Sequence, residues 1–240
     1  MNTKIKLSSL TLVALVVLLS ATLIACGGTA SALSPATEAA ALQSSPTSAQ
    51  ELSDAEAEGI LYMREEEKLA RDVYLKLYEE WGLSTFNNIA NSEQTHMDAL
   101  KTLIDRYDLD DPAEGKDIGE FTNQALQELY NQLVEEGRQS LEDALKVGAA
   151  VEEIDILDLQ QHIAQTDRGD IQLVYENLMK GSRNHLRAFV SVIERQGWTY
   201  QPQYLSQEAF DEIINTPTER GGSGGGGGRG SGGGGGRGGK

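Results

Sequence analysis

The strongest constraint in this 240-residue chain is a helical period through its middle part, roughly residues 51–218. Apolar side chains recur there every three or four positions, whereas alternating apolar runs that would favour strands are absent. Four long helices are expected at about 54–81, 84–109, 140–163 and 170–196. A short helix is expected near 122–136 and an extension with another short helix near 198–215. The pattern predicts an all-α fold built on a four-helix bundle.

Each of the four long segments also carries acidic residues or a histidine on its apolar face. These residues are Glu67, Glu93, His96, Glu152, Asp155 and His185. A buried carboxylate is costly unless it is paired or bound to a metal. Glu93 and His96 are one helical turn apart, so the two side chains can hold one ion together. Oxygen and imidazole ligands without thiolate suit iron or manganese, and zinc is a further alternative. The sequence therefore predicts a metal site within the bundle.

The same helical geometry assigns the neighbouring polar residues. Glu66 lies about 100° from Glu67, at the edge of the apolar face, and Glu65 points away from it. His162 lies about 80° from the apolar centre of its segment, which predicts a surface histidine.

Two tyrosines lie seven residues from positions on the polar layer, Tyr74 after Glu67 and Tyr175 before Ser182. Both are candidates to donate hydrogen bonds to the carboxylates that bind metal. Simple core tyrosines with satisfied hydroxyls are an equal alternative.

Two motifs carry a resemblance to a known family. Glu67-Lys-Leu-Ala-Arg-Asp-Val-Tyr74 is similar to the first-helix motif of rubrerythrins, and Ser92-Glu93-Gln-Thr-His96 resembles their second-helix Glu-x-x-His. The segment from Met63 to about Arg220 resembles a bacterial and archaeal ferritin-like family known as a domain of unknown function. The stretches 64–74, 147–149, 181–189 and 202–206 carry that match. The resemblance implies a ferritin-like four-helix bundle, in which two helices give Glu and two give Glu-x-x-His.

The chain departs from that ligand pattern in the fourth helix, which reads Ser182-Arg-Asn-His185. Serine is a poor bridging ligand, and the pair Glu152 and Asp155 can compensate. The resemblance then implies a two-metal site with two groups of ligands, one of Glu67, Glu93 and His96 and the other of Glu152, Asp155 and His185. A single-metal site is the alternative.

Three functions are compatible with these residues. The first is an oxidoreductase in which two Fe(II) ions deliver two electrons to peroxide or dioxygen. It would need an external reductant, because the sequence has no Cys-x-x-Cys and therefore nothing that resembles the rubredoxin module that supplies electrons to rubrerythrin. The second is a metal-binding or metal-sensing protein without turnover, and the third is a structural interaction module. A homodimer is one further arrangement compatible with the sequence.

Charge excludes one class of partner. Residues 51–220 hold 15 Lys and Arg against 36 Asp and Glu, a net charge of −21, while the whole chain has −17. Nucleic-acid binding needs a basic surface, so nucleic acid is not an expected partner. Cations are.

The two ends of the chain have their own character. Residues 1–25 carry Lys4 and Lys6 before an apolar stretch, which is typical of a signal peptide. Leu23-Ile24-Ala25-Cys26 resembles a bacterial lipobox, which implies lipidation of Cys26, the only cysteine, and a membrane anchor on the extracytoplasmic face. An ordinary signal peptide or an uncleaved anchor is the alternative. Residues 26–52 are predicted to be a flexible stalk, 53–218 the ferritin-like domain, and 219–240 a disordered Gly/Arg-rich tail.

Overall fold

The computed structural model describes residues 52–220 of the chain. The expected signal peptide, Cys26, the stalk up to residue 51 and the tail from residue 221 lie outside the described residues. Six α-helices and no strands make up the described part: α1 (Asp54–Trp81), α2 (Ser84–Arg106), α3 (Gln124–Gly137), α4 (Leu141–Ala164), α5 (Gly169–Arg195) and α6 (Gln207–Asn215). The all-α prediction is confirmed.

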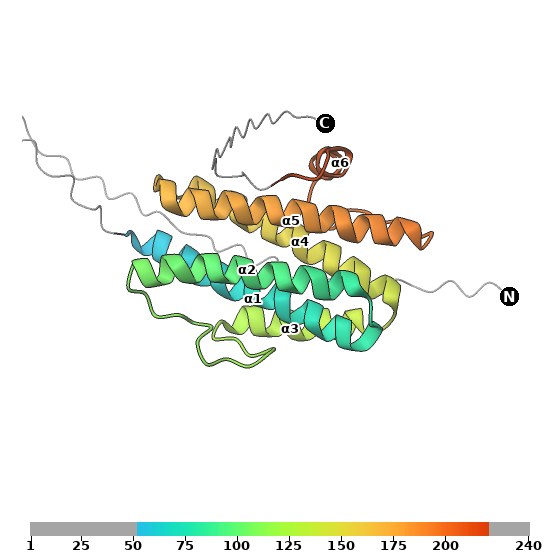
Figure 1. The fold of residues 1–240 in the computed structure, drawn as a ribbon, viewed down its shortest axis with the longest axis horizontal. Coiled ribbons are helices and arrows are strands. Elements are labelled where there is room, and N and C mark those ends of the chain that lie inside the picture. Colours follow the sequence, from blue (N-terminus) through green and yellow to red (C-terminus); the bar gives the residue numbers. More distant parts are fainter. Residues whose placement is uncertain (1–51, 221–240) are drawn as a thin grey trace, which may run out of the picture. The chain divides into compact units, whose positions relative to one another are not determined.

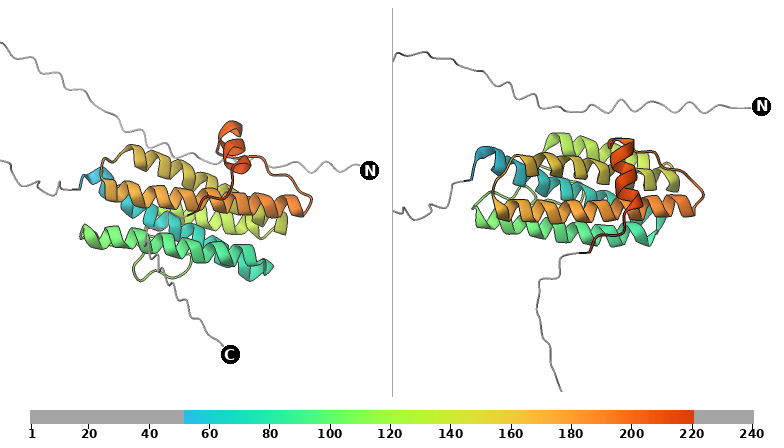
Figure 2. Two further views of the ribbon diagram at one scale, coloured as in Figure 1. Left: turned by 45° about the horizontal axis from the view of Figure 1, so that its top comes forward. Right: turned by 90° about the horizontal axis from the view of Figure 1, so that it is seen from above.

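Helices α1, α2, α4 and α5 form a four-helix bundle (Figure 1). α1 packs along α2 and α4 along α5, and the two pairs join through α1 on α4 and α2 on α5. The connection from α2 to α4 contains the extra helix α3, which packs against α1 and α4. The C-terminal extension carries α6, which crosses α5 (Figure 2).

The helix ends follow local sequence signals. Ser53 and Glu56 form a capping box at the start of α1, and Gly82 ends the helix with a φ of 63°, where a residue without Cβ is favoured. Ser140 caps α4 by accepting a hydrogen bond from the backbone N–H of Asp143. α2 has no side-chain cap at its start, because Leu83 stands at the N-cap position and Ser84 is already helical.

The apolar core is divided by a layer of polar side chains. One cluster surrounds Tyr74, Phe86 and Phe189, and the other contains Ile60, Leu100 and further buried residues nearer the opposite end of the bundle. Each bundle helix contributes residues to both clusters, and buried acids or a histidine lie near the change from one cluster to the other. This layer is the part of the fold that positions the functional side chains.

The extra segments cover faces of the bundle that would otherwise be exposed. Glu65 on α1 accepts hydrogen bonds from the backbone N–H groups of Thr122 and Asn123, at the start of α3. Glu65 was predicted to point away from the apolar face that carries Glu67, and it is nevertheless buried, because α3 and the segment before it cover that side of α1.

The C-terminal extension is fixed to α4 by a buried carboxylate. Glu153, which is 0% exposed, accepts a hydrogen bond from the Tyr200 hydroxyl at 2.7 Å. It also accepts bonds from the backbone N–H groups of Gln203, Tyr204 and Leu205 at 2.7–2.9 Å. Such charge-assisted bonds are the stronger class of hydrogen bond, so the extension is an integral part of the domain.

Among residues 52–220, no helix is both long and apolar enough to span a lipid bilayer.

Candidate metal centre

A first group of ligands joins α1 to α2. His96 Nδ1 lies 2.7 Å from Glu93 Oε2 and 3.1 Å from Glu67 Oε2. Glu67 and Glu93 are 1% and 2% exposed, and His96 is buried as well. One ligand atom from each of the three residues lies within 4.8 Å of the others, a spacing at which all three can hold one ion. We call this group the first triad.

A second group of ligands joins α2 to α4 and α5. His185 Nδ1 lies 2.8 Å from Glu93 Oε1 and 3.5 Å from Glu152 Oε2. These three residues are also buried and meet the same 4.8 Å spacing, and we call them the second triad. Glu93 presents Oε2 to the first triad and Oε1 to the second. Its carboxylate is therefore placed to bridge two ions.

The two histidine rings lie together where α2 meets α5. Their centroids are 5.5 Å apart and the planes are inclined by 26°. His185 Nε2 lies 2.9 Å from the Ser92 hydroxyl, which fixes the direction of its ring. His96 depends on Gly181 for space, because a Cβ at position 181 would lie 2.5 Å from its Nε2. Neither Ser92 nor Gly181 was identified from the sequence as part of the site.

Tyr74 contacts the second triad from α1. Its hydroxyl donates a hydrogen bond to Glu152 Oε1 at 2.6 Å, and Gly148 O is 3.2 Å away. Phe189 packs against the ring with centroids 5.2 Å apart. A fully buried donor of this kind orients the carboxylate without competing for its second oxygen.

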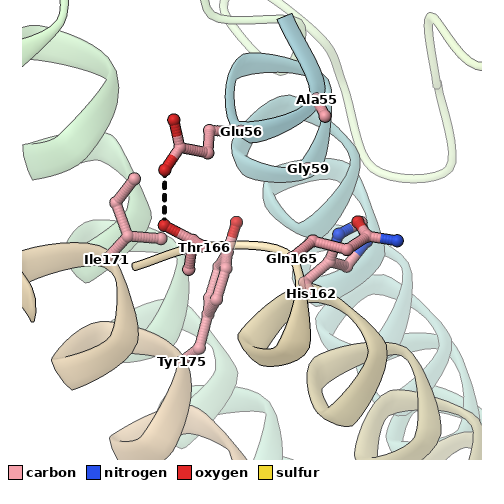
Figure 3. A pocket seen from close by; sticks show the side chains of 8 residues that line it. All are labelled: Ala55, Glu56, Gly59, His162, Gln165, Thr166, Ile171 and Tyr175. Atoms are coloured by element: carbon pink, nitrogen blue, oxygen red, sulfur yellow. Dashed lines mark hydrogen bonds between the residues drawn. The ribbon is translucent and has the colours of Figure 1, made fainter. Parts of the chain in front are cut away.

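Tyr175 is placed differently from Tyr74. Its hydroxyl is buried and has no hydrogen-bond partner. The ring belongs to the second apolar cluster, and its hydroxyl borders a small pocket with Glu56, Gly59 and His162 (Figure 3). The prediction that Tyr175 donates to a ligand carboxylate was wrong, because its hydroxyl borders this pocket, which no residue of either triad lines.

His162 lines the same pocket and is half-buried, so the prediction of a surface histidine was wrong. It packs beside the rings of Tyr62 and Tyr175, and burial lowers its pKa. It belongs to neither triad.

Asp155 lies in the buried layer but outside both triads. The Ser182 hydroxyl donates a hydrogen bond to Asp155 Oδ2, while Oδ1 has no partner. Burial and the neighbouring carboxylates, Glu67 first among them, raise the pKa of Asp155 well above its ordinary value. Of the six ligands predicted from the sequence, five form the triads and Asp155 is adjacent to them.

Glu66 is a further buried acid of this layer, whereas its sequence position placed it at the edge of the apolar face. It is buried because α4 packs against that side of α1. Burial and the charges of Asp158 and Asp155 raise the pKa of Glu66 well above its ordinary value. The run of three consecutive glutamates at 65–67 was the one sequence feature that could have indicated a further buried acid beside Glu67.

The charges of the two triads are strongly linked. Burial raises the pKa of Glu67 and of Glu152 to about 7. Burial acts against the charge of Glu93 too, but His185 and His96 outweigh it and lower its pKa. Burial opposes the charge on His185, yet Glu93 and Glu152 raise its pKa to about 10. Without an ion, protons shared among these groups must offset the buried negative charge.

Several ligand atoms of the two triads are buried without a well-aligned hydrogen bond. His185 Nδ1 and Glu93 Oε1 are 2.8 Å apart, yet neither forms a hydrogen bond, because their directions do not meet donor–acceptor geometry. Glu67 Oε1 is likewise buried without a partner. Buried polar atoms without partners are uncommon and call for an explanation such as an ion. Imidazole nitrogen and carboxylate oxygen are ligands for iron, manganese or zinc.

Comparison with known proteins identifies relatives of the whole domain. The chain is 57% identical over 172 residues to "Uncharacterized protein MJ0754" of Methanocaldococcus jannaschii, covering 72% of this chain and 93% of that protein. A crystal structure of hypothetical protein MJ0754 from Methanococcus jannaschii DSM 2661 superimposes with a TM-score of 0.70 at 55% identity, covering 73% of this chain and all of that one. Residues 56–217 match the family model described as "Uncharacterized protein domain (DUF2202)". The chain therefore belongs to the DUF2202 family.

Proposed function

We propose that this protein is a ferritin-like metal-binding protein that holds two divalent cations, with iron favoured over manganese or zinc. The sharing of Glu93 between two buried triads is the observation that carries this proposal. Its support is a carboxylate with one oxygen directed to each triad, on a helix whose Glu-x-x-His motif resembles that of rubrerythrins.

Each side chain has a role in this proposal. Glu67 and His96 hold one ion, Glu152 and His185 hold the other, and Glu93 bridges them. Carboxylates and imidazoles of this kind bind iron without thiolate. The second Glu-x-x-His of a ferritin-like bundle is replaced here by Ser182 and His185, and Asp155 supplies a carboxylate beside that position.

We propose further that the protein is an oxidoreductase that reduces peroxide or dioxygen at this site. Two bound Fe(II) ions would supply the two electrons, and an external reductant would restore them. In the metal-free protein, burial raises the pKa of Glu67 and Glu152 to about 7, and binding of the ions would displace the protons that these carboxylates share. Tyr74 would hold Glu152 in one orientation.

The test is the metal content of the protein purified from its own host. Two irons per chain, together with Fe(II) oxidation by peroxide or dioxygen, would support the oxidoreductase. One zinc or manganese would favour a metal-binding protein without turnover. A preparation that binds no metal under any loading condition would leave only the structural interaction module.

We also propose that the domain is tethered outside the cytoplasmic membrane through Cys26, on the strength of the Leu-Ile-Ala-Cys motif. Cys26→Ser should abolish lipid labelling and the cleavage before residue 26. Wild-type protein found free in the medium with a different N-terminus would refute the anchor.

A further inference from the structure

Ser92 and Glu93 are neighbours on α2, and both contact the same imidazole on α5. The Ser92 hydroxyl lies 2.9 Å from His185 Nε2, and Glu93 Oε1 lies 2.8 Å from His185 Nδ1. The two nitrogens of a histidine are distinct, and the partner of one nitrogen decides whether the other is left to bind a metal. When Nδ1 binds an ion, Nε2 carries the proton and donates a hydrogen bond to the Ser92 hydroxyl. This bond holds the ring so that Nδ1 points into the second triad.

The carboxylate of Glu152 in the second triad is oriented in the same manner. Its Oε1 accepts a hydrogen bond from the buried Tyr74 hydroxyl at 2.6 Å, while its Oε2 lies 3.5 Å from His185 Nδ1. Glu93 Oε1 and His185 Nδ1 are both buried without a hydrogen bond. An ion bound between these atoms would satisfy them without breaking either of the two orienting bonds.

The first triad lacks such partners. His96 Nδ1, the ligand atom, forms a hydrogen bond with Glu67 Oε2 at 3.1 Å, and an ion bound between the two atoms must replace this bond. Within residues 52–220 no hydrogen bond reaches His96 Nε2, and Glu67 Oε1 is buried without a partner. Neither His96 nor Glu67 is therefore oriented by a hydrogen bond from outside the triad.

The ring of His96 is held by a steric contact with Gly181 instead. A Cβ at position 181 would lie 2.5 Å from Nε2 and Cε1 of His96, but 3.8 Å from Cε1 of His185. Glycine is unfavourable in the interior of a helix, and Gly181 lies well inside α5. What position 181 supplies is space for His96. A steric contact limits the ring on one side, whereas a hydrogen bond also fixes which nitrogen carries the proton.

We propose that the two ion positions are unequal: the second triad binds the tighter ion, and Ser92 is the positioning residue that makes His185 Nδ1 its nitrogen ligand. This inference rests on the proposed two-ion function. Ligands that already have their bound orientation lose less freedom when the ion binds. The ion in the first triad must also displace the hydrogen bond between His96 and Glu67, so it binds more weakly and exchanges first.

The first test is a Co²⁺ titration of the metal-free full chain, followed by the visible absorption of the bound ions. The wild type should bind two ions in two steps. Ser92→Ala should weaken the tighter step about 10- to 100-fold, as expected when a hydrogen bond to a metal ligand is lost. Ser92→Thr keeps the hydroxyl and should restore that step. The control is Thr95→Ala, which removes an exposed hydroxyl from the same helix and should leave both steps unchanged.

The second test identifies the triad that fills first. The chain has three histidines, so the ring ¹⁵N NMR signals of His96, His162 and His185 can be followed separately as Zn²⁺ is added. The first equivalent should move the signals of His185, and the second should move those of His96. His162 belongs to neither triad and is the internal reference.

Gly181→Ala is the matched variant for the first triad. Its added Cβ displaces His96, so it should weaken the second step and leave the first step unchanged. Wild-type Co²⁺ binding in Ser92→Ala would overturn the inference and leave the two-ion function intact. A first equivalent of Zn²⁺ that moves His96 before His185, or both rings equally, would overturn it too. A wild-type chain that binds neither Co²⁺ nor Zn²⁺ would instead refute the proposed function itself.

Discussion

The hydroxyl of Ser182 on α5 donates a hydrogen bond to the carboxylate of Asp155 on α4. In the proposed ferritin-like ligand pattern, a glutamate would stand where this chain has Ser182, and this serine contacts a carboxylate from the neighbouring helix. The acid is present near the site, but a different helix supplies it. A glutamate introduced at position 182 would therefore lie next to the carboxylate of Asp155.

Ser182→Glu should therefore crowd Asp155 rather than complete the site. It adds a buried negative charge beside an existing one, so the metal-free protein should melt at a lower temperature, and added iron should recover part of the loss. Iron titration should still saturate at the wild-type stoichiometry. Ser182→Ala, which removes only the donor, is the control. A higher stoichiometry in Ser182→Glu would show that Asp155 does not occupy that position.

His96→Ala should lose most of the bound metal, because it removes the nitrogen ligand of the first triad and leaves Glu67 and Glu93 without their shared partner. His162→Ala removes a histidine that lies outside both triads, and its metal content should match the wild type. Elemental analysis at equal amounts of folded protein compares the two. Equal losses in both variants would mean that the triads do not bind the metal.

Tyr74→Phe should weaken metal binding about 10- to 100-fold, as expected when a hydrogen bond that orients a ligand is lost. Tyr175→Phe is the matched control, because the hydroxyl it removes has no partner and lies outside the polar layer. Competition with a chelator of known affinity measures both variants. An equal effect of the two substitutions would argue against orientation of Glu152 by Tyr74.

The metal-free protein should lose stability as pH rises from about 5 to about 8. Glu67 and Glu152 have pKa values of about 7 in the folded state, against an ordinary value of 4.5, so the folded state binds more protons than the unfolded chain in this window. Stability then falls as pH rises. His185, raised to about 10, contributes stability that is fully present below its ordinary value of 6.5 and is lost in the same direction above it.

Saturating metal should flatten that pH dependence, because the ion replaces the shared protons. Thermal melts of the metal-free and loaded forms across the window test this. Melting temperatures of the metal-free form that increase from pH 5 to pH 8 would contradict the assignment of the shared protons to these groups.

The bundle and most of its polar layer were predictable from the sequence. An apolar period of 3.6 residues marks each long helix, and the cost of burying a carboxylate singles out Glu67, Glu93 and Glu152. A single-helix projection does not show what covers the remaining faces. The start of α3 covers Glu65, α4 covers Glu66, and the C-terminal extension covers Glu153. The packing of these elements depends on contacts between residues that are distant in sequence.

His162 was misplaced because a projection of one helix does not show the rings of Tyr62 and Tyr175 that pack beside it. Tyr175 was misplaced for a related reason. A heptad spacing places a side chain on the right face of a helix, but the residue on the opposing helix decides what it meets. Tyr74 meets Glu152 there, whereas Tyr175 lies near Gly59.

Four consecutive buried charges on α1, residues 65–68, each interact with a different part of the protein. Glu65 binds the start of α3, Glu66 faces α4, Glu67 contacts α2, and Lys68 donates to Asp72 and to the carbonyl of Asp117. A rotation of α1 about its axis would break several of these contacts at once. The helix is therefore locked in azimuth. In the proposed metal site, adjustment of Glu67 to an ion of different size or charge would therefore come from rotation about its side-chain bonds, while the backbone of α1 stays in place.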